Sequence, residues 1–164
     1  MKASIASLSR GFYDETQIAS ATRYIGTPDG QLIDDRTYYV IEATRHPPPA
    51  NRQPLLACGG WSARAKLFTG TSDQETVSGF TEVARIRAMF VDPACARRGL
   101  GRRILEASEN AAQQAGFTTF ELMATLPGVP LYEACGYRAV ENADIELPDG
   151  VRLRCLVMRK SLPT

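Results

Sequence analysis

The 164 residues suffice for one ordinary domain and are too few for a barrel of eight strand–helix units, which needs about 250 residues. Hydrophobic residues make up 44% of the chain and charged residues 23%, so we expect a packed core rather than a disordered chain. The 19 basic and 18 acidic residues leave a net charge of +1, which argues against a general nucleic-acid-binding protein.

The compartment can also be predicted from composition. No apolar run approaches the roughly 18 residues that a membrane span requires, and the first eight residues are too weakly apolar for a signal-peptide core. Only one histidine, His46, accompanies four widely spaced cysteines (Cys58, Cys95, Cys135 and Cys155), which argues against a metal site. We therefore expect reduced thiols, no metal, no membrane contact and a cytoplasmic protein.

The first elements have clear local signals. Asp14 followed by Gln17 is a capping-box pattern that predicts a helix over 15–24, ended by the turn-forming residues 26–30. A short helical piece is expected over 4–9. β-branched and aromatic residues predict a strand over 37–43.

A hairpin-like pair is expected next. Three prolines within 46–51 cannot stay in a ladder, so this segment is predicted to be an exposed connection. Residues 55–61 then form the partner strand, and the polar stretch 62–79 is predicted to be a loop. Residues 82–91 alternate at first and end wholly apolar, as expected of a strand entering the middle of a sheet.

The second half predicts a strand–helix–strand crossover followed by a hairpin. A helix is expected from the glycine turn at 99–101 to about Gln114, ended by Gly116. Its predicted inward stripe has helical spacing and consists of Leu100, Ile104, Ala107 or Ser108, Ala111 and Ala115. A strand over 117–123, a short helix over 130–135 and a hairpin of 137–146 with 151–159 follow. The sequence thus predicts one α/β domain with a mixed sheet, spanning 1–164.

The glycine turn predicts an anion site. Gly99 and Gly101 lie between a strand and a helix, where unpaired amides and the positive end of the helix dipole attract phosphate. A dinucleotide fingerprint fails because its third glycine position is Ile104, and the P-loop residues are absent. Four arginines, Arg97, Arg98, Arg102 and Arg103, surround the turn; the alternative is an arginine-flanked turn that merely begins a helix.

Two motifs in order give this segment a family resemblance. The run 96–101 matches the phosphate motif Gln/Arg-x-x-Gly-x-Gly/Ala except at Ala96, and Leu131, Tyr132, Gly136 and Tyr137 match a second motif. Residues 37–160 resemble the GNAT superfamily of acyl-CoA-dependent N-acetyltransferases. The resemblance implies a mixed, mostly antiparallel central sheet flanked by helices.

One departure from the family lies at the N-terminus. The strand that normally precedes the first helix is missing, either because the true start lies upstream or because the edge at 37–43 stays open. Since an open edge invites pairing with another chain, we expect a homodimer.

The resemblance also implies residue roles. Backbone groups of Met89, Phe90 and Val91 pair with the pantetheine arm of acetyl-CoA, in a gap where the strands 84–91 and 117–123 splay apart. The pyrophosphate is held by the amides of Arg97, Arg98, Gly99, Leu100, Gly101 and Arg102. Tyr132 protonates the departing thiolate as general acid, after a neutral amine has attacked the thioester in a ternary complex.

Several points stay open at this level. Arg85 occupies the position where some family members carry a catalytic carboxylate, and arginine cannot act as a base. Glu82, Glu121 and water remain candidates for the base, and Tyr132 can alternatively pack beside the cofactor without proton transfer. Thr125 stands where the family often has Asn and can cap the following helix.

The sequence therefore predicts an acetyltransferase acting on an amine of a small molecule or a protein. The alternative is a non-catalytic acyl-CoA-binding or interaction domain on the same fold.

Overall fold

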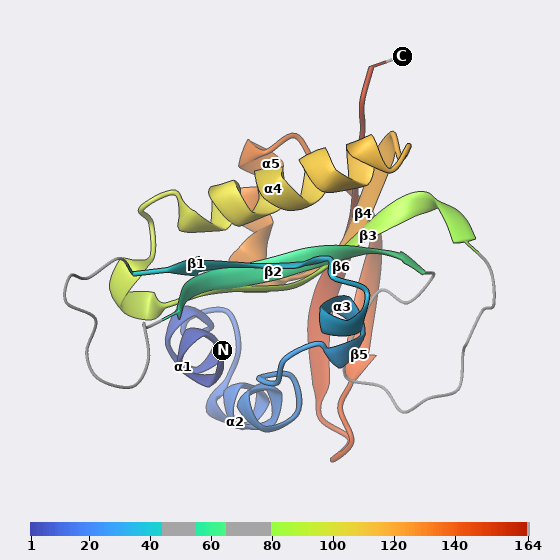
Figure 1. Cartoon of the computed structure of the whole chain (residues 1–164). Coiled ribbons are helices and arrows are strands. Elements are labelled where there is room, and N and C mark those ends of the chain that lie inside the picture. The colour runs from blue at the N-terminus through green and yellow to red at the C-terminus, as the bar shows by residue number, and fades with distance from the viewer. Residues whose placement is uncertain (44–54, 65–79, 164) are drawn as a thin grey trace.

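A six-stranded sheet organises the computed structural model, which describes residues 1–43, 55–64 and 80–163. Helices α4 and α5 cover one face of the sheet and α1, α2 and α3 lie against the other (Figure 1). The elements are, in chain order, α1 (Lys2–Leu8), α2 (Glu15–Tyr24), α3 (Gly30–Asp34), β1 (Tyr38–Glu42), β2 (Leu55–Arg64), β3 (Phe80–Val91), the 3-10 turn η1 (Pro93–Cys95), α4 (Leu100–Gln114), β4 (Thr119–Thr125), the 3-10 turn η2 (Leu126–Gly128), α5 (Val129–Ala134), β5 (Arg138–Glu146) and β6 (Arg152–Ser161).

The strand order is β1-β2-β3-β4-β6-β5. Every neighbouring pair is antiparallel except β3 and β4, which are parallel and joined by the α4 crossover. This confirms the predicted mixed, mostly antiparallel sheet. Among the described strands, β1 stands at one edge of the sheet and β5 at the other. No helix of the described chain is long and apolar enough to cross a membrane.

Two predictions about the first half need correction. The segment after α2 is not only a turn, because Asp29 accepts a hydrogen bond from the amide of Leu32 and so starts the short helix α3. The loop predicted over 62–79 begins later than expected, since β2 continues to Arg64. The predicted proline connection and the rest of that loop, 65–79, lie outside the described residues.

Helix α4 packs on the sheet through a face that is rotated from the predicted stripe. Ala115 is exposed, whereas Leu105 and Ala112 are fully buried. Both pack in one core cluster with Phe120 and Leu122 of β4, whereas Ile104 lies beside Gly59 of β2. The rotation follows from size, because burying Leu105 removes more apolar surface from water than burying Ala115 would.

Polar contacts attach α2 to the β5–β6 hairpin on the opposite face. The side-chain amide of Gln17 donates to the carbonyl of Arg152 at 2.8 Å. The Ser20 hydroxyl donates to the Asp149 carboxylate at 2.7 Å. Both contacts join residues more than 120 positions apart in the chain, so they hold α2 against the hairpin.

The capping box at the start of α2 yields a stability prediction. The Asp14 carboxylate accepts from the Gln17 amide at 2.8 Å, so Asp14→Ala is expected to lower the free energy of unfolding by about 1 kcal/mol. Urea denaturation measures the change. Asp14→Asn keeps a capping acceptor and should retain nearly all of the stability; an equal loss in both variants would assign the effect to charge rather than to capping.

Candidate active site

The parallel strands β3 and β4 part after a short ladder. Their pairing runs from Val83 opposite Thr119 to Arg85 opposite Glu121 and then stops. β3 nevertheless continues to Val91 and β4 to Thr125. The backbone groups of both strands beyond the last pair are therefore not used to join β3 to β4, and the sheet opens between them.

A bulge in β3 follows this opening. Arg87 lies opposite Gly60 and Phe90 opposite Cys58, so β3 contains one residue more than β2 between these pairs. Ala88 takes up the extra length in a left-handed conformation, with φ of +55°, which is rare for a residue other than glycine. Beyond the bulge the ladder with β2 resumes, with Phe90 opposite Cys58 and Val91 opposite Ala57.

A cavity of about 110 Å³ lies at this opening. Tyr132 and the consecutive β3 residues from Ile86 to Phe90, Arg87 among them, all line it. Residues of the N-terminal helices and of the last hairpin close it, namely Ile5, Ser9, Tyr13, Ala21, Ile25, Thr27, Ile145 and Leu153. The structure thus brings the predicted general acid to the predicted pantetheine-binding strand.

Tyr132 is held in one place by its neighbours. It is buried, packs edge-on against Tyr137 with ring centroids 5.9 Å apart, and lies so close to Gly128 that a Cβ there would be 2.9 Å from its ring. Burial raises the pKa of Tyr132 above its usual value, so its hydroxyl keeps the proton throughout the neutral range. A protonated phenol at the cavity wall can donate a proton.

The start of α4 has the properties of an anion site. Gly99 caps the helix with φ of +80° and no side-chain hydrogen bond. Among the described residues, the backbone amides from Arg97 to Arg102 have no hydrogen-bond partner. The side chains of Arg97, Arg98, Arg102 and Arg103 are all exposed around them. Free amides and positive charge at a helix start bind phosphate readily.

Gly101 has a second role. A Cβ at this position would lie 3.0 Å from a methyl group of Leu131 and 3.5 Å from one of Val91. The glycine therefore lets α4 approach both β3 and α5. In addition, Arg102 donates a hydrogen bond to the Ala134 carbonyl at 3.3 Å, which ties the start of α4 to the helix that carries Tyr132.

The two glutamates considered as bases do not line this cavity. Glu121 is buried in ion pairs with Arg85 and with Arg159, whose Nε is 2.8 Å from its carboxylate. Glu82 lines a separate hollow of about 500 Å³, which Thr118 and Ser161 also line. Arg85 is therefore a partner for a buried acid at the end of the β3–β4 ladder.

Tyr13 is a cavity residue that no sequence motif indicated. Its hydroxyl donates to the Arg154 carbonyl at 2.6 Å and accepts from the Leu126 amide at 2.9 Å. Thr125 occupies the N-cap of η2, but its side chain makes no cap hydrogen bond, and the amide of Leu126 donates to Tyr13 instead. Tyr13 thus joins the N-terminal helices to the segment that leads into α5.

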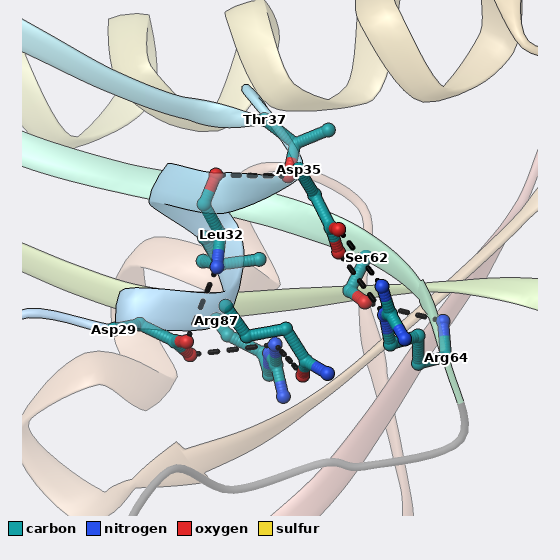
Figure 2. A network of polar contacts seen from close by, with 8 residues as sticks. Asp29, Leu32, Asp35, Thr37, Ser62, Arg64 and Arg87 are labelled. Atoms are coloured by element: carbon teal, nitrogen blue, oxygen red, sulfur yellow. Dashed lines mark hydrogen bonds and ion pairs between the residues drawn. The ribbon is translucent and has the colours of Figure 1, made fainter.

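A second unpredicted group lies beside the bulge (Figure 2). Arg87 and Asp29 are both almost completely buried, with Nη2 of Arg87 3.4 Å from the Asp29 carboxylate. The same Nη2 donates to the side-chain carbonyl of Gln31 at 2.9 Å. The strand pattern around Arg87 carries no signal of such a contact, because one partner is the N-cap residue of α3 and the other lies within that helix.

The family model described as an acetyltransferase (GNAT) domain matches residues 61–160. The chain belongs to the GNAT acetyltransferase family. Membership supports acyl transfer with acetyl-CoA as donor, as the two sequence motifs predict. Among the described residues, no group of three or more His, Cys, Asp or Glu residues could hold a metal ion.

Solved structures show the same GNAT fold. A GCN5-related N-acetyltransferase from Rhodopseudomonas palustris has 18% identity and a TM-score of 0.67, with 98% of this chain and 84% of that chain covered. A PaiA N-acetyltransferase from Thermoplasma acidophilum, in complex with coenzyme A, has 12% identity and a TM-score of 0.61 over 98% and 87%. The ribosomal-protein-S18-alanine N-acetyltransferase from Escherichia coli has 18% identity and a TM-score of 0.52 over 93% and 92%. A search of curated proteins with the sequence found no significant match.

Tyr13 provides the prediction from this site. Tyr13→Phe removes both hydrogen bonds of the hydroxyl and leaves the half-buried Leu126 amide without a partner, so we expect a loss of about 1–3 kcal/mol in the free energy of unfolding. Thermal and urea denaturation measure it. The matched control is Tyr24→Phe on α2, which should stay close to the wild-type stability; equal losses in both variants would contradict the role given to the Tyr13 hydroxyl.

Proposed function

We propose that this GNAT domain transfers an acetyl group from acetyl-CoA to an amine in a ternary complex. The observation that carries the proposal is the cavity shared by Tyr132 and the bulged end of β3. It lies where β3 and β4 part. Helix α4 begins with free amides at the end of β3, where Gly101 faces Val91. A thioester and an acceptor need such a place to meet.

Two segments are proposed to hold acetyl-CoA. The pyrophosphate binds the amides of Arg97, Arg98, Gly99, Leu100, Gly101 and Arg102, with the arginine side chains adding charge. The pantetheine arm runs along Met89, Phe90 and Val91. This fits the described ladder, in which the β4 side of these residues is not paired with β4.

The reaction follows from these placements. The nitrogen lone pair of a neutral amine attacks the thioester carbonyl carbon, so a C–N bond forms while negative charge develops on oxygen. A backbone amide near Phe90 stabilises that oxygen. The C–S bond then breaks, the thiolate takes the proton of the Tyr132 hydroxyl, and the resulting phenolate regains a proton from water. The amine loses its proton to water, since Glu82 and Glu121 lie away from the cavity.

The acceptor is proposed to be an amine of a small molecule or a protein. One relative of similar fold is named for an alanine of a ribosomal protein, which supports including peptide amines among the acceptors to test. The protein is further proposed to be cytoplasmic and to form a homodimer through the open edge of β1.

Tyr132→Phe tests the chemistry. We expect kcat to fall by about 10²-fold or more, with little change in the affinity for CoA, because the ring still packs but cannot donate a proton. Release of free thiol from acetyl-CoA, over a panel of small amines and peptides, measures the rate. Unchanged turnover across the pH range would exclude the general-acid role. Tight CoA binding by the wild type without any turnover would favour the non-catalytic acyl-CoA-binding domain instead.

The anion site has its own test. Replacing Arg97 and Arg98 together by alanine should raise the Kd for CoA about tenfold, because charge-assisted contacts to phosphate are lost. Calorimetry at low and high salt measures the effect, which should shrink at high salt. Arg138→Ala, on exposed β5, is the control and should leave the Kd unchanged. Similar effects in both proteins would contradict a specific phosphate site at the α4 start.

A further inference from the structure

We infer that the buried Arg87–Asp29 ion pair is a positioning device that fixes the bulge of β3 and thereby the course of Met89 and Phe90 along the cavity. The role in acetyl transfer rests on the function proposed above. Neither residue belongs to the motifs through which the sequence resembles its family.

The bulge needs support from outside its own strand. Ala88 holds a left-handed conformation that an L side chain disfavours, and such residues persist where their surroundings leave no alternative. On the β4 side the ladder ends at Arg85, so β4 does not restrain the bulge. The residue immediately before Ala88 is Arg87, and its side chain reaches away from the sheet to α3.

The contact between Arg87 and α3 is built into the interior. The exposed fraction of the side chain is only 1% for Arg87 and 3% for Asp29. Asp29 has two functions, because its carboxylate pairs with Arg87 and also accepts the Leu32 amide at 3.3 Å as the cap of α3. A buried charge that loses its partner is strongly destabilised, so this pair constrains both segments.

Helix α3 is held in place by contacts on both of its sides (Figure 2). Leu32 is fully buried in it, and its carbonyl accepts the amide of Thr37 at 2.9 Å next to β1. At the far end of α3, Asp35 pairs with Arg64 of β2 at 2.8 Å, in an ion pair that faces solvent. The Arg87–Asp29 contact therefore ties the bulge to a helix that the rest of the domain holds in place.

The position of the bulge matters for the chemistry. Ala88, Met89 and Phe90 line the cavity with Tyr132, so a rotation at Ala88 moves the groups proposed to orient the thioester. Misplacement by about 1 Å can reduce a rate about 10²-fold. The CoA pyrophosphate is proposed to bind at 97–102 instead, so the affinity for CoA should depend little on Arg87.

The test uses a mutant cycle in the full chain: Asp29→Asn, Arg87→Met and the double variant. Asn keeps the cap of α3 while removing the charge. Each single variant should be less stable than the wild type, whereas the double variant should recover much of the stability because no buried charge is left unpaired. The control is the double variant Asp35→Asn/Arg64→Met, which removes the exposed ion pair of the same helix.

Two readouts separate positioning from stability. In the double variant, amide hydrogen exchange over 88–91 should become about 10-fold faster or more, while the β2–β3 pairs that precede the bulge stay protected. Its kcat for acetyl transfer should fall about 10- to 10²-fold, with the Kd for CoA within about threefold of the wild type. The Asp35→Asn/Arg64→Met control should match the wild type in both readouts. Arg87→Lys keeps a buried cation beside Asp29 but loses the guanidinium contact to Gln31; it should show a smaller fall in kcat at an unchanged Kd, and it serves if the double variant does not fold.

The outcomes are distinct. A stable double variant with wild-type kcat overturns the positioning role, whether or not exchange is faster. A fall in kcat that is accompanied by an equal fall in the control assigns the effect to α3 as a whole and also overturns it. If the wild type transfers no acetyl group to any amine, the proposed function fails. Hydrogen exchange then still tests the ion pair: unchanged exchange over 88–91 in the double variant would reject the pair as the support of the bulge.

Discussion

The early end of the parallel ladder between β3 and β4 is the constraint on which the site depends. After Arg85 and Glu121 the two strands no longer pair, so their remaining residues border an opening within the sheet. Because parallel strands need a crossover, α4 joins β3 to β4 across one face of the sheet. Near its start, Gly101 lies against Val91 at the end of β3 and against Leu131 of the helix that carries Tyr132. The break in the ladder opens the cavity, and the free amides of the helix start lie at the end of the same strand.

The last paired residues of that ladder also explain a departure from the family. Where other members can carry a catalytic carboxylate, Arg85 pairs with Glu121, and Arg159 of β6 pairs with the same carboxylate. A buried acid with two cationic partners connects three neighbouring strands. The charge at this position thus contributes to the end of the ladder rather than to the cavity lining.

Much of the fold could be predicted because its signals are local. The capping box of Asp14, the Asp149–Gly150 turn and the glycine turn before α4 each determine a boundary through backbone geometry or one nearby hydrogen bond. The prediction failed where an element was very short or where the same residues fit two arrangements equally well. Helix α3 has only five residues, and the buried face of α4 was mistaken because small residues are compatible with either side of a helix.

The sequence by itself determined the family, the order of the elements and the two motifs around Gly99 and Tyr132, because these depend on residues close together in the chain. Only the tertiary structure decided what surrounds them. Tyr13 bonds to Arg154, 141 residues away, and Arg87 finds Asp29 and Gln31 in a helix that lies before β1. Such contacts depend on which faces of the sheet are covered and on the cost of leaving a buried polar group without a partner, and neither is encoded in any local pattern.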